Sequence, residues 1–159
     1  MMNTEQQTEH FLIRQVTGED RGKIEAFFAQ MGEESTSFFN VGRGNEKTAL
    51  AYTDGKLPEH LYFMALDEND PVPAGIAFLW DKSTRVPWFG IAVAEKHKGK
   101  HLGRRLIAAV REYCEQKGCG GILLTTHQNN LRAQRLYEHC GFERLGVHEN
   151  GELLYLLRF

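Results

Sequence analysis

A strand that leads through a glycine-containing loop into a long helix, and then into a second strand, constrains this fold more than any other feature. Residues 86–93 (VPWFGIAV) are typical of a buried strand, and residues 101–116 repeat apolar side chains at helical spacing. The glycine-rich segment 118–121 ends that helix, and residues 122–126 (ILLTT) predict the second strand. A helix that connects two strands of one sheet makes them parallel, whereas hairpins make strands antiparallel.

The rest of the chain predicts strands joined by short turns, with helices among them. Residues 33–52 are consistent with one or two short helices broken near residues 42–44. The order predicts an α/β (α+β) fold, in which a mixed, mostly antiparallel sheet of six or seven strands is flanked by helices. We expect the other strands at residues 10–16, 61–66, 74–80, 142–147 and 153–159, and the other helices at residues 20–31 and 130–140.

The composition is that of one globular domain. The chain has 159 residues, 42% of them hydrophobic, and a formal net charge of −2, so bulk charge does not favour nucleic acid or an anionic membrane as partner. No apolar run approaches the roughly 20 residues that span a bilayer. Three cysteines form no disulfide framework, and the first residues lack the pattern of a signal peptide, so we expect a cytoplasmic protein. We expect a single domain over residues 10–159 and a disordered polar segment at residues 1–9.

The loop before the long helix concentrates positive charge. Five Lys or Arg and two His lie between Lys96 and Arg105. Gly99 and Gly103 allow a ligand to approach the backbone, and the first helical N–H groups have no partner inside the helix. Together with the helix dipole, these groups predict an anion site suited to a pyrophosphate, with Lys98, Lys100, Arg104 and Arg105 adding charge. The glycine spacing fits neither a Walker loop nor a dinucleotide-binding fingerprint; the alternative is a solvated basic loop.

Two segments resemble one family. Lys98–Gly103 (KGKHLG) resembles the Q/R-x-x-G-x-G/A signature of the GNAT N-acetyltransferase superfamily, and residues 130–142 (NLRAQRLYEHCGF) resemble its N-x-x-A-x-x-L-Y-E-x-x-G-F motif. The order of the elements is also that of the family. Lys98 replaces the usual Gln or Arg, and His101 replaces the glycine at the fourth position of the signature; a helical φ at His101 would still permit close phosphate contact.

The resemblance implies a slot for acetyl-CoA where the fourth and fifth strands splay apart. Backbone groups of Ile91 and Val93 would meet the pantetheine arm. Asn130 matches a position that contacts the cofactor arm, although it is equally suited to cap the following helix, and Ala133 would allow close packing against the cofactor. The pyrophosphate loop would comprise Lys98, Gly99, Lys100, His101, Leu102, Gly103 and Arg104.

Tyr137 matches the tyrosine of the second motif. When an amine attacks a thioester, coenzyme A leaves as a thiolate, and a phenol with a pKa of about 10 can protonate that sulfur or donate a hydrogen bond to it. The alternative is a core aromatic residue. The resemblance therefore implies acetyl transfer from acetyl-CoA to a primary amine of a small molecule or peptide, directly in a ternary complex and without a metal.

Two other functions stay open. A non-catalytic acyl-CoA-binding or regulatory module of the same fold would keep the loop without needing Tyr137, and a transferase of longer acyl groups would need a wider slot. The sequence is also compatible with a homodimer.

No motif identifies the acceptor or the base that takes its proton. An ordered water is as suitable as any side chain, and Cys140 lacks the neighbours that an acyl-carrying nucleophile needs. Trp88 lies on the strand that faces the slot and is the best acceptor contact, although alternation makes about half of the nearby aromatic residues core. The candidate bases are Glu33, Glu34, His127, Asp81 and His60, and the candidate aromatic contacts are Phe38, Phe39, Trp80, Trp88 and Phe89.

Overall fold

The computed structural model describes residues 10–39 and 45–159, with the side chain of Phe39 left out. In this part of the chain one seven-stranded sheet has the order β1-β2-β3-β4-β5-β7-β6. All neighbours are antiparallel except β4 and β5, which confirms the predicted mixed sheet. Residues 1–9, expected to be disordered, lie outside the described residues. The strands are β1 Phe11–Gln15, β2 Leu61–Asp67, β3 Gly75–Trp80, β4 Trp88–Val93, β5 Gly121–Thr126, β6 Glu143–Val147 and β7 Leu153–Arg158.

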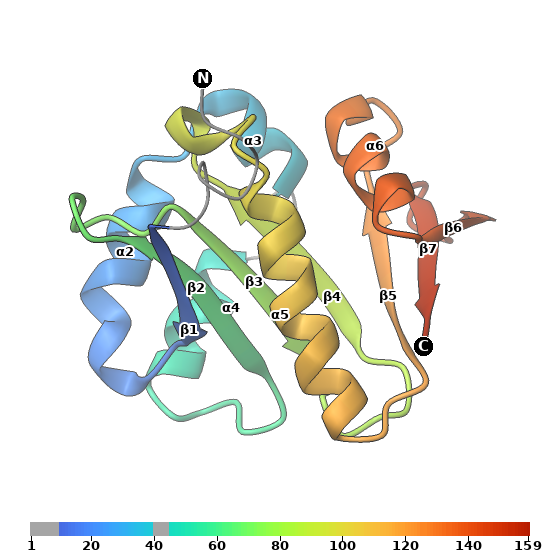
Figure 1. Cartoon of the computed structure of the whole chain (residues 1–159), viewed down its shortest axis with the longest axis horizontal. Helices are drawn as coiled ribbons and strands as arrows, with labels where there is room; N and C mark the ends of the chain where they lie inside the picture. The colour runs from blue at the N-terminus through green and yellow to red at the C-terminus, as the bar shows by residue number, and fades with distance from the viewer. Residues whose placement is uncertain (1–9, 40–44) are drawn as a thin grey trace.

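Helices cover both faces of the sheet. Figure 1 shows α5 crossing in front of β2 to β4, while α4 lies behind the sheet. The ambiguous segment after residue 32 forms two helices, as one of the alternatives predicted, and the expected break near residues 42–44 falls outside the described residues. The helices are α2 Arg21–Ala29, α3 Glu33–Phe39, α4 Asn45–Thr53, α5 Leu102–Gln116 and α6 Leu131–His139, with short 3-10 turns η1 Gly18–Asp20 and η2 Glu95–His97.

Alternation along the strands divides the buried side chains into two cores. Leu79 and Phe89 pack with Leu106 of α5 on one face. Ile76 and Phe78 belong to the core on the opposite face, which also contains residues of α2 and α4. Each fully buried large apolar side chain contributes about 1.5–3 kcal/mol relative to exposure, so neither face can lose its helices without a large loss of stability.

Several element ends differ slightly from the predicted ones for local reasons. α5 begins at Leu102 and α6 at Leu131, because the preceding residues act as N-caps outside the helical backbone. β4 begins at Trp88, the register partner of Trp80, which is the last residue of β3. Among the described residues, no helix combines the length and the apolar character that crossing a bilayer requires.

Candidate functional site

The parallel strands β4 and β5 pair over a very short stretch. Their ladder consists of one register pair, Trp88 with Leu123. Near this end the N–H of Gly120 donates to the carbonyl of Arg85 at 2.7 Å, and the N–H of Leu123 donates to that of Pro87 at 3.0 Å. Beyond it the two strands diverge, as Figure 1 shows, which confirms the predicted splay between the fourth and fifth strands.

The diverging part of β4 directs backbone groups into the gap. The N–H of Ala94 donates to the carbonyl of Ala74 at 2.8 Å, in the same register that pairs β3 with β4. Since a strand directs successive backbone groups to alternate sides, residues 88, 90 and 92 bond to β3. Ile91 and Val93 therefore direct their N–H and C=O groups toward β5, where no ladder pair takes them up.

A cavity of about 850 Å³ occupies this gap and extends to both faces of the sheet. Its walls come from β4, β5, α3, the loop before α5, and the N-terminal parts of α5 and α6. Of the residues predicted for the donor side, Lys100 and Arg105 do not line the cavity, and the amino group of Lys100 instead lies 3.3 Å from Nδ1 of His97. The predicted residues that do line it are Ile91, Val93, Lys98, Gly99, His101, Leu102, Gly103, Arg104, Asn130, Ala133 and Tyr137.

The loop at the N-terminus of α5 uses two left-handed backbone positions. Gly99 has φ +83°, a conformation that glycine adopts freely. His101, the N-cap of α5, has φ 62° and ψ 17°, so it does not adopt the helical φ that was considered for this residue. The family's glycine is explained by this geometry, since a Cβ in the left-handed region costs roughly 1–2 kcal/mol.

The positive side chains of the loop are not all directed at the cavity. The amino group of Lys98 donates to Oε1 of Glu95 and to Oγ of Ser35 in α3, both at 2.7 Å. The hydrogen bond from Lys98, followed by a second one that Oγ of Ser35 donates to Glu95 at 2.9 Å, lowers the pKa of the Glu95 carboxyl. The guanidinium of Arg105 donates to the carbonyl of Phe11 at 2.9 Å, so the expectation that it adds charge to the anion site is wrong.

His97 is a buried residue of the loop that sequence reasoning did not single out. Its side chain lines the cavity wall and its ring meets that of Phe11 edge to face. Burial, followed by the charges of Lys100 and Lys96, lowers the pKa of its imidazole. The ring is therefore neutral at pH 7, and Nδ1 accepts from Lys100 because an ammonium group can only donate.

Two arginines of α6 add positive charge that the motifs did not predict. Arg132 and Arg135 line the cavity together with Arg104 of α5. A Cβ built on Gly99 would lie 3.8 Å from the guanidinium of Arg132, which places this arginine against the glycine loop. The sequence did contain a signal for this pair: Arg132 and Arg135 are three residues apart, so they lie on the same side of the helix that Asn130 caps. The cavity wall around the loop is thus strongly cationic.

Asn130 and the glycine at position 103 fix how α6 meets α5. Oδ1 of Asn130 accepts a hydrogen bond from the N–H of Ala133 at 3.3 Å, which confirms its role as N-cap. A Cβ on Gly103 would lie 2.8 Å from Cδ2 of Leu136, so glycine allows the two helices to approach closely. The N-termini of both helices therefore lie at the cavity, and both favour negative charge.

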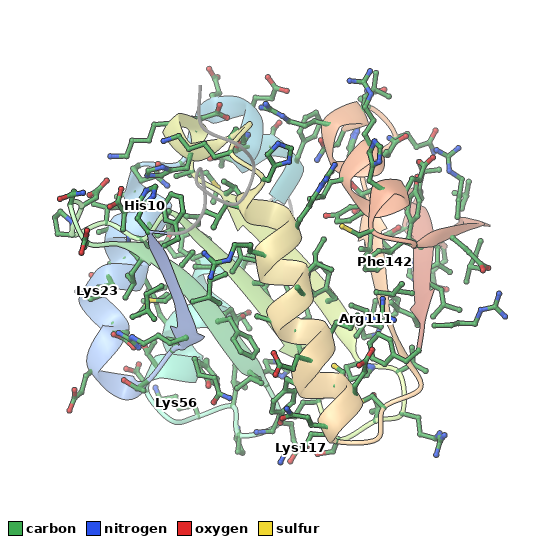
Figure 2. The ribbon with its side chains drawn as sticks, viewed as in Figure 1. His10, Lys23, Lys56, Arg111, Lys117 and Phe142 are labelled. Atoms are coloured by element: carbon green, nitrogen blue, oxygen red, sulfur yellow. The ribbon has the colours of Figure 1, made fainter. Side chains whose placement is uncertain are left out.

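Tyr137 lies at the inner wall of the cavity. Its side chain is 6% exposed and packs against Phe142, with ring centroids 5.5 Å apart, and against Tyr155 at 5.9 Å. Phe142 is labelled in Figure 2, below α6. Burial raises the pKa of the Tyr137 hydroxyl, and the neighbouring Glu152 adds to that effect. The phenol is therefore neutral, and its O–H remains a donor at physiological pH.

Aromatic side chains line the cavity on the face opposite α5. The predicted contacts Trp80, Trp88 and Phe38 line it here, and Phe89 lines it from the α5 face, while the side chain of Phe39 lies outside the described residues. Sequence reasoning missed Phe78, which lies across from Gly90 in the next strand. Figure 2 places Lys23, Lys56 and Lys117 along the outer edge of the molecule, away from this cavity.

The structure places only some of the candidate bases at the cavity. Glu34 lines the cavity, whereas Glu33, His127, His60 and Asp81 do not. His127 instead contacts the ring of Phe38, and His60 stacks on Trp80. His148, which sequence reasoning missed, lines the cavity and contacts Trp88 edge to face.

Comparison with known proteins agrees with this geometry. Residues 25–142 match the profile of the acetyltransferase (GNAT) family. Over 91 residues the chain is 30% identical to the mycothiol acetyltransferase of Renibacterium salmoninarum, a match that covers 52% of this chain and 26% of that relative. The chain thus spans about a quarter of the length of that curated relative.

Solved structures share the fold over nearly the whole chain. The ribosomal-protein-S5-alanine acetyltransferase of Vibrio fischeri superposes with a TM-score of 0.77 at 15% identity, covering 94% of this chain and 93% of that one. The paia N-acetyltransferase of Thermoplasma acidophilum, solved in complex with coenzyme A, has a TM-score of 0.72 at 15% identity, with coverages of 94% and 99%.

Proposed function

Because the chain belongs to the GNAT acetyltransferase family, we propose that it transfers an acetyl group from acetyl-CoA to a primary amine, directly and in a ternary complex. The observation that carries this proposal is the slot between β4 and β5. One wall is β4, in which the backbone groups of Ile91 and Val93 have no ladder partner in β5. One end is the cationic loop at the N-terminus of α5. An elongated ligand with an amide-bearing arm and phosphates at its far end fits both features.

The donor side of the slot fits the two ends of acetyl-CoA differently. Backbone groups of Ile91 and Val93 would bind the amide-containing arm as an added strand does. The amides of the loop and Arg104, with Arg132 from α6, would hold the phosphates through charge-assisted hydrogen bonds of about 1.5–3 kcal/mol each. Bound acetyl-CoA supplies an activated thioester.

Tyr137 acts on the sulfur by donating a hydrogen bond. An ordinary thiol has a pKa of about 8.5, below that of an unperturbed phenol at about 10. Burial raises the pKa of Tyr137 further, so complete proton transfer from this phenol to a thiolate is uphill. The residue therefore stabilises developing negative charge on sulfur while the proton stays on its own oxygen, and the thiolate leaves with that hydrogen bond in place.

The acceptor nitrogen must lose a proton before or during attack. Among the described residues, Glu34 of α3 and His148, whose ring contacts Trp88, are titratable side chains that line the cavity. We assign proton removal to this pair, either directly or through a water between the nitrogen and the side chain. Single substitutions of each, followed by the pH profile of kcat, separate the two contributions.

The proposed location follows from the cysteines. Cys114, Cys119 and Cys140 are all free thiols, with Cys114 buried. Free thiols persist in reducing compartments, so we propose that the protein works in the cytoplasm.

The test of the proposed function is thiol release from acetyl-CoA in the presence of primary amines, alongside calorimetric binding of coenzyme A. Release that depends on both enzyme and amine is expected. Tight coenzyme A binding without release for any amine would identify a non-catalytic acyl-CoA-binding module instead. Faster release from a longer acyl-CoA would change the donor while leaving the reaction class in place.

A further inference from the structure

We infer that the acceptor is a small primary amine that carries an aromatic ring, bound against a wall formed by Phe78, Trp80 and Trp88. This inference rests on the proposed function, because it assigns the second substrate of the same cavity. It is carried by the arrangement and the charge of the acceptor side.

The wall is continuous across two strands. Trp80 of β3 and Trp88 of β4 are register partners, so their side chains project from the same face of the sheet. The Phe78 ring stacks on that of Trp80, with centroids 4.9 Å apart and an interplanar angle of 22°. Phe78 is the register partner of Gly90. A Cβ at Gly90 would overlap the Phe78 ring, so the absence of a side chain at position 90 leaves room for that ring.

Trp80 is held in place from three sides. His60 directly precedes β2, and its ring stacks on the Trp80 ring with centroids 5.5 Å apart and an interplanar angle of 18°. The indole N–H of Trp80 donates to the hydroxyl of Tyr62 at 3.1 Å. A flat surface that is fixed before binding loses little conformational freedom when another ring packs on it, so this wall favours rigid aromatic ligands over flexible chains.

The opposite side of the acceptor space belongs to α3. Phe38 of this helix lines the cavity, and its ring contacts His127, with centroids 5.3 Å apart, across the open end of the slot. Trp88 is held edge to face by His148 at 5.7 Å. An acceptor that enters here is therefore flanked by rings contributed from β3, β4 and α3.

The charges on this side do not suit a polycation or a phosphorylated sugar. Among the described lining residues, the carboxylates are Glu34 and Glu95, and Glu95 already accepts from Lys98 and Ser35. One remaining carboxylate matches one ammonium group, whereas the further ammonium groups of a polyamine would meet no second free carboxylate among the described lining residues. The arginines and the lysine of the cavity belong to the loop, α5 and α6, where the donor phosphates are proposed to bind.

Binding can be measured at the wall itself, because the two tryptophans of the chain are Trp80 and Trp88. The probe is 2-phenylethylamine, titrated into the full-length protein saturated with coenzyme A while tryptophan fluorescence is excited selectively. Butylamine, spermidine and glucosamine 6-phosphate are the comparison ligands. We expect half-saturation by 2-phenylethylamine at a concentration at least tenfold lower than by any of the three. Equal half-saturation, or tighter binding of spermidine or the sugar phosphate, overturns the inference.

Turnover of the same amines separates this inference from the proposed function. Release of thiol with a kcat/KM at least tenfold higher for 2-phenylethylamine supports both. Release that is fastest with spermidine, the sugar phosphate or a peptide N-terminus overturns the aromatic acceptor and leaves the transferase intact. Selective binding of 2-phenylethylamine without release from acetyl-CoA sustains the aromatic site and removes the transferase.

Variants locate the effect. Trp88→Ala should raise KM for 2-phenylethylamine about tenfold while KM for acetyl-CoA changes less than twofold, and Trp88→Phe should recover most of the loss. Phe159→Ala removes an aromatic ring at the far end of the chain, 36% exposed and outside the cavity lining, and should change neither constant. An unchanged amine KM in folded Trp88→Ala overturns the assignment, as does an equal loss for butylamine.

Discussion

The two sides of the cavity are built from different parts of the polypeptide. On the donor side, backbone groups of Ile91 and Val93, the glycine loop and two helix N-termini face the slot. On the acceptor side, the surface consists of side chains such as Trp80, Trp88 and Phe38. Backbone groups are the same in every residue, so a donor site made from them needs only a particular path of the chain. A side-chain surface changes with each substitution, which lets one fold accept different amines.

The largest expected effect tests the donor side. Gly103→Glu introduces a carboxylate where phosphates are proposed to bind and a Cβ within 2.8 Å of Leu136. Like-charge repulsion and lost space should weaken coenzyme A binding at least a hundredfold, which corresponds to about 2.7 kcal/mol. Calorimetry measures the affinity. Gly22→Glu makes the same charge change where nothing lies within 4 Å of the new Cβ, and it should leave the affinity unchanged.

Thermal unfolding accompanies that measurement, because a shift of α5 against α6 could destabilise the protein. Arg104→Ala provides a second route, since it removes a cation from the cavity without adding bulk. If coenzyme A binds Gly103→Glu and Arg104→Ala as tightly as the unchanged protein, the anion site lies elsewhere.

The next effect lies where the two sides meet. Tyr137→Phe removes one oxygen but keeps the contacts with Phe142 and Tyr155. The loss of a hydrogen bond to the leaving sulfur should lower kcat roughly 10- to 100-fold with little change in either KM. Steady-state kinetics measure this change. Tyr113→Phe, on α5 and outside the cavity lining, is the matched control.

The pH profile sharpens the assignment of Tyr137. Because burial raises its pKa, the phenol stays protonated from neutral pH through at least about pH 10, and kcat should show no alkaline decrease from this group in that range. An alkaline decrease below pH 10 that disappears in Tyr137→Phe would contradict the raised pKa.

A smaller effect tests whether the two sides communicate. The hydroxyl of Ser35 in α3 donates to Glu95 at 2.9 Å and accepts from Lys98, so it joins the acceptor-side helix to the donor loop. Ser35→Ala should raise the amine KM about threefold, in proportion to a loss of about 0.5–1 kcal/mol for the contacts. Ser37 bonds within its own helix, to the carbonyl of Glu34, so Ser37→Ala should have no such effect. Identical behaviour of the two variants in kinetic assays would show that the sides are independent.

The smallest effect concerns the backbone of the loop. His101→Gly relieves a left-handed backbone and should raise the free energy of unfolding by about 0.5–1 kcal/mol, after the greater freedom of glycine in the unfolded chain is subtracted. Chemical denaturation measures it. Asp81 also has a positive φ, 57°, but aspartate tolerates this region better, so Asp81→Gly should change stability less. Destabilisation by His101→Gly, or weakened coenzyme A binding, would assign the imidazole a role in the site.

The sequence by itself determined the order of the elements, the parallel pair and the position of the glycine loop. These features follow from the periodicity of apolar residues and from glycine spacing, which act locally or through a motif of fixed length. The left-handed φ of His101 did not follow, because the type of a residue with a side chain does not indicate a conformation that the neighbouring packing imposes.

Only the tertiary structure decided which charged and aromatic residues share the cavity. Lys98 was predicted to face a phosphate but is tied to Ser35, which lies 63 positions away in the sequence. Arg105 leaves the site to bond β1, and Arg132 joins it from α6. Long side chains select partners by distance in space, which depends on how helices pack and not on neighbours in the chain. The acceptor wall depends on the register between β3 and β4, and no local pattern of residues specifies that register.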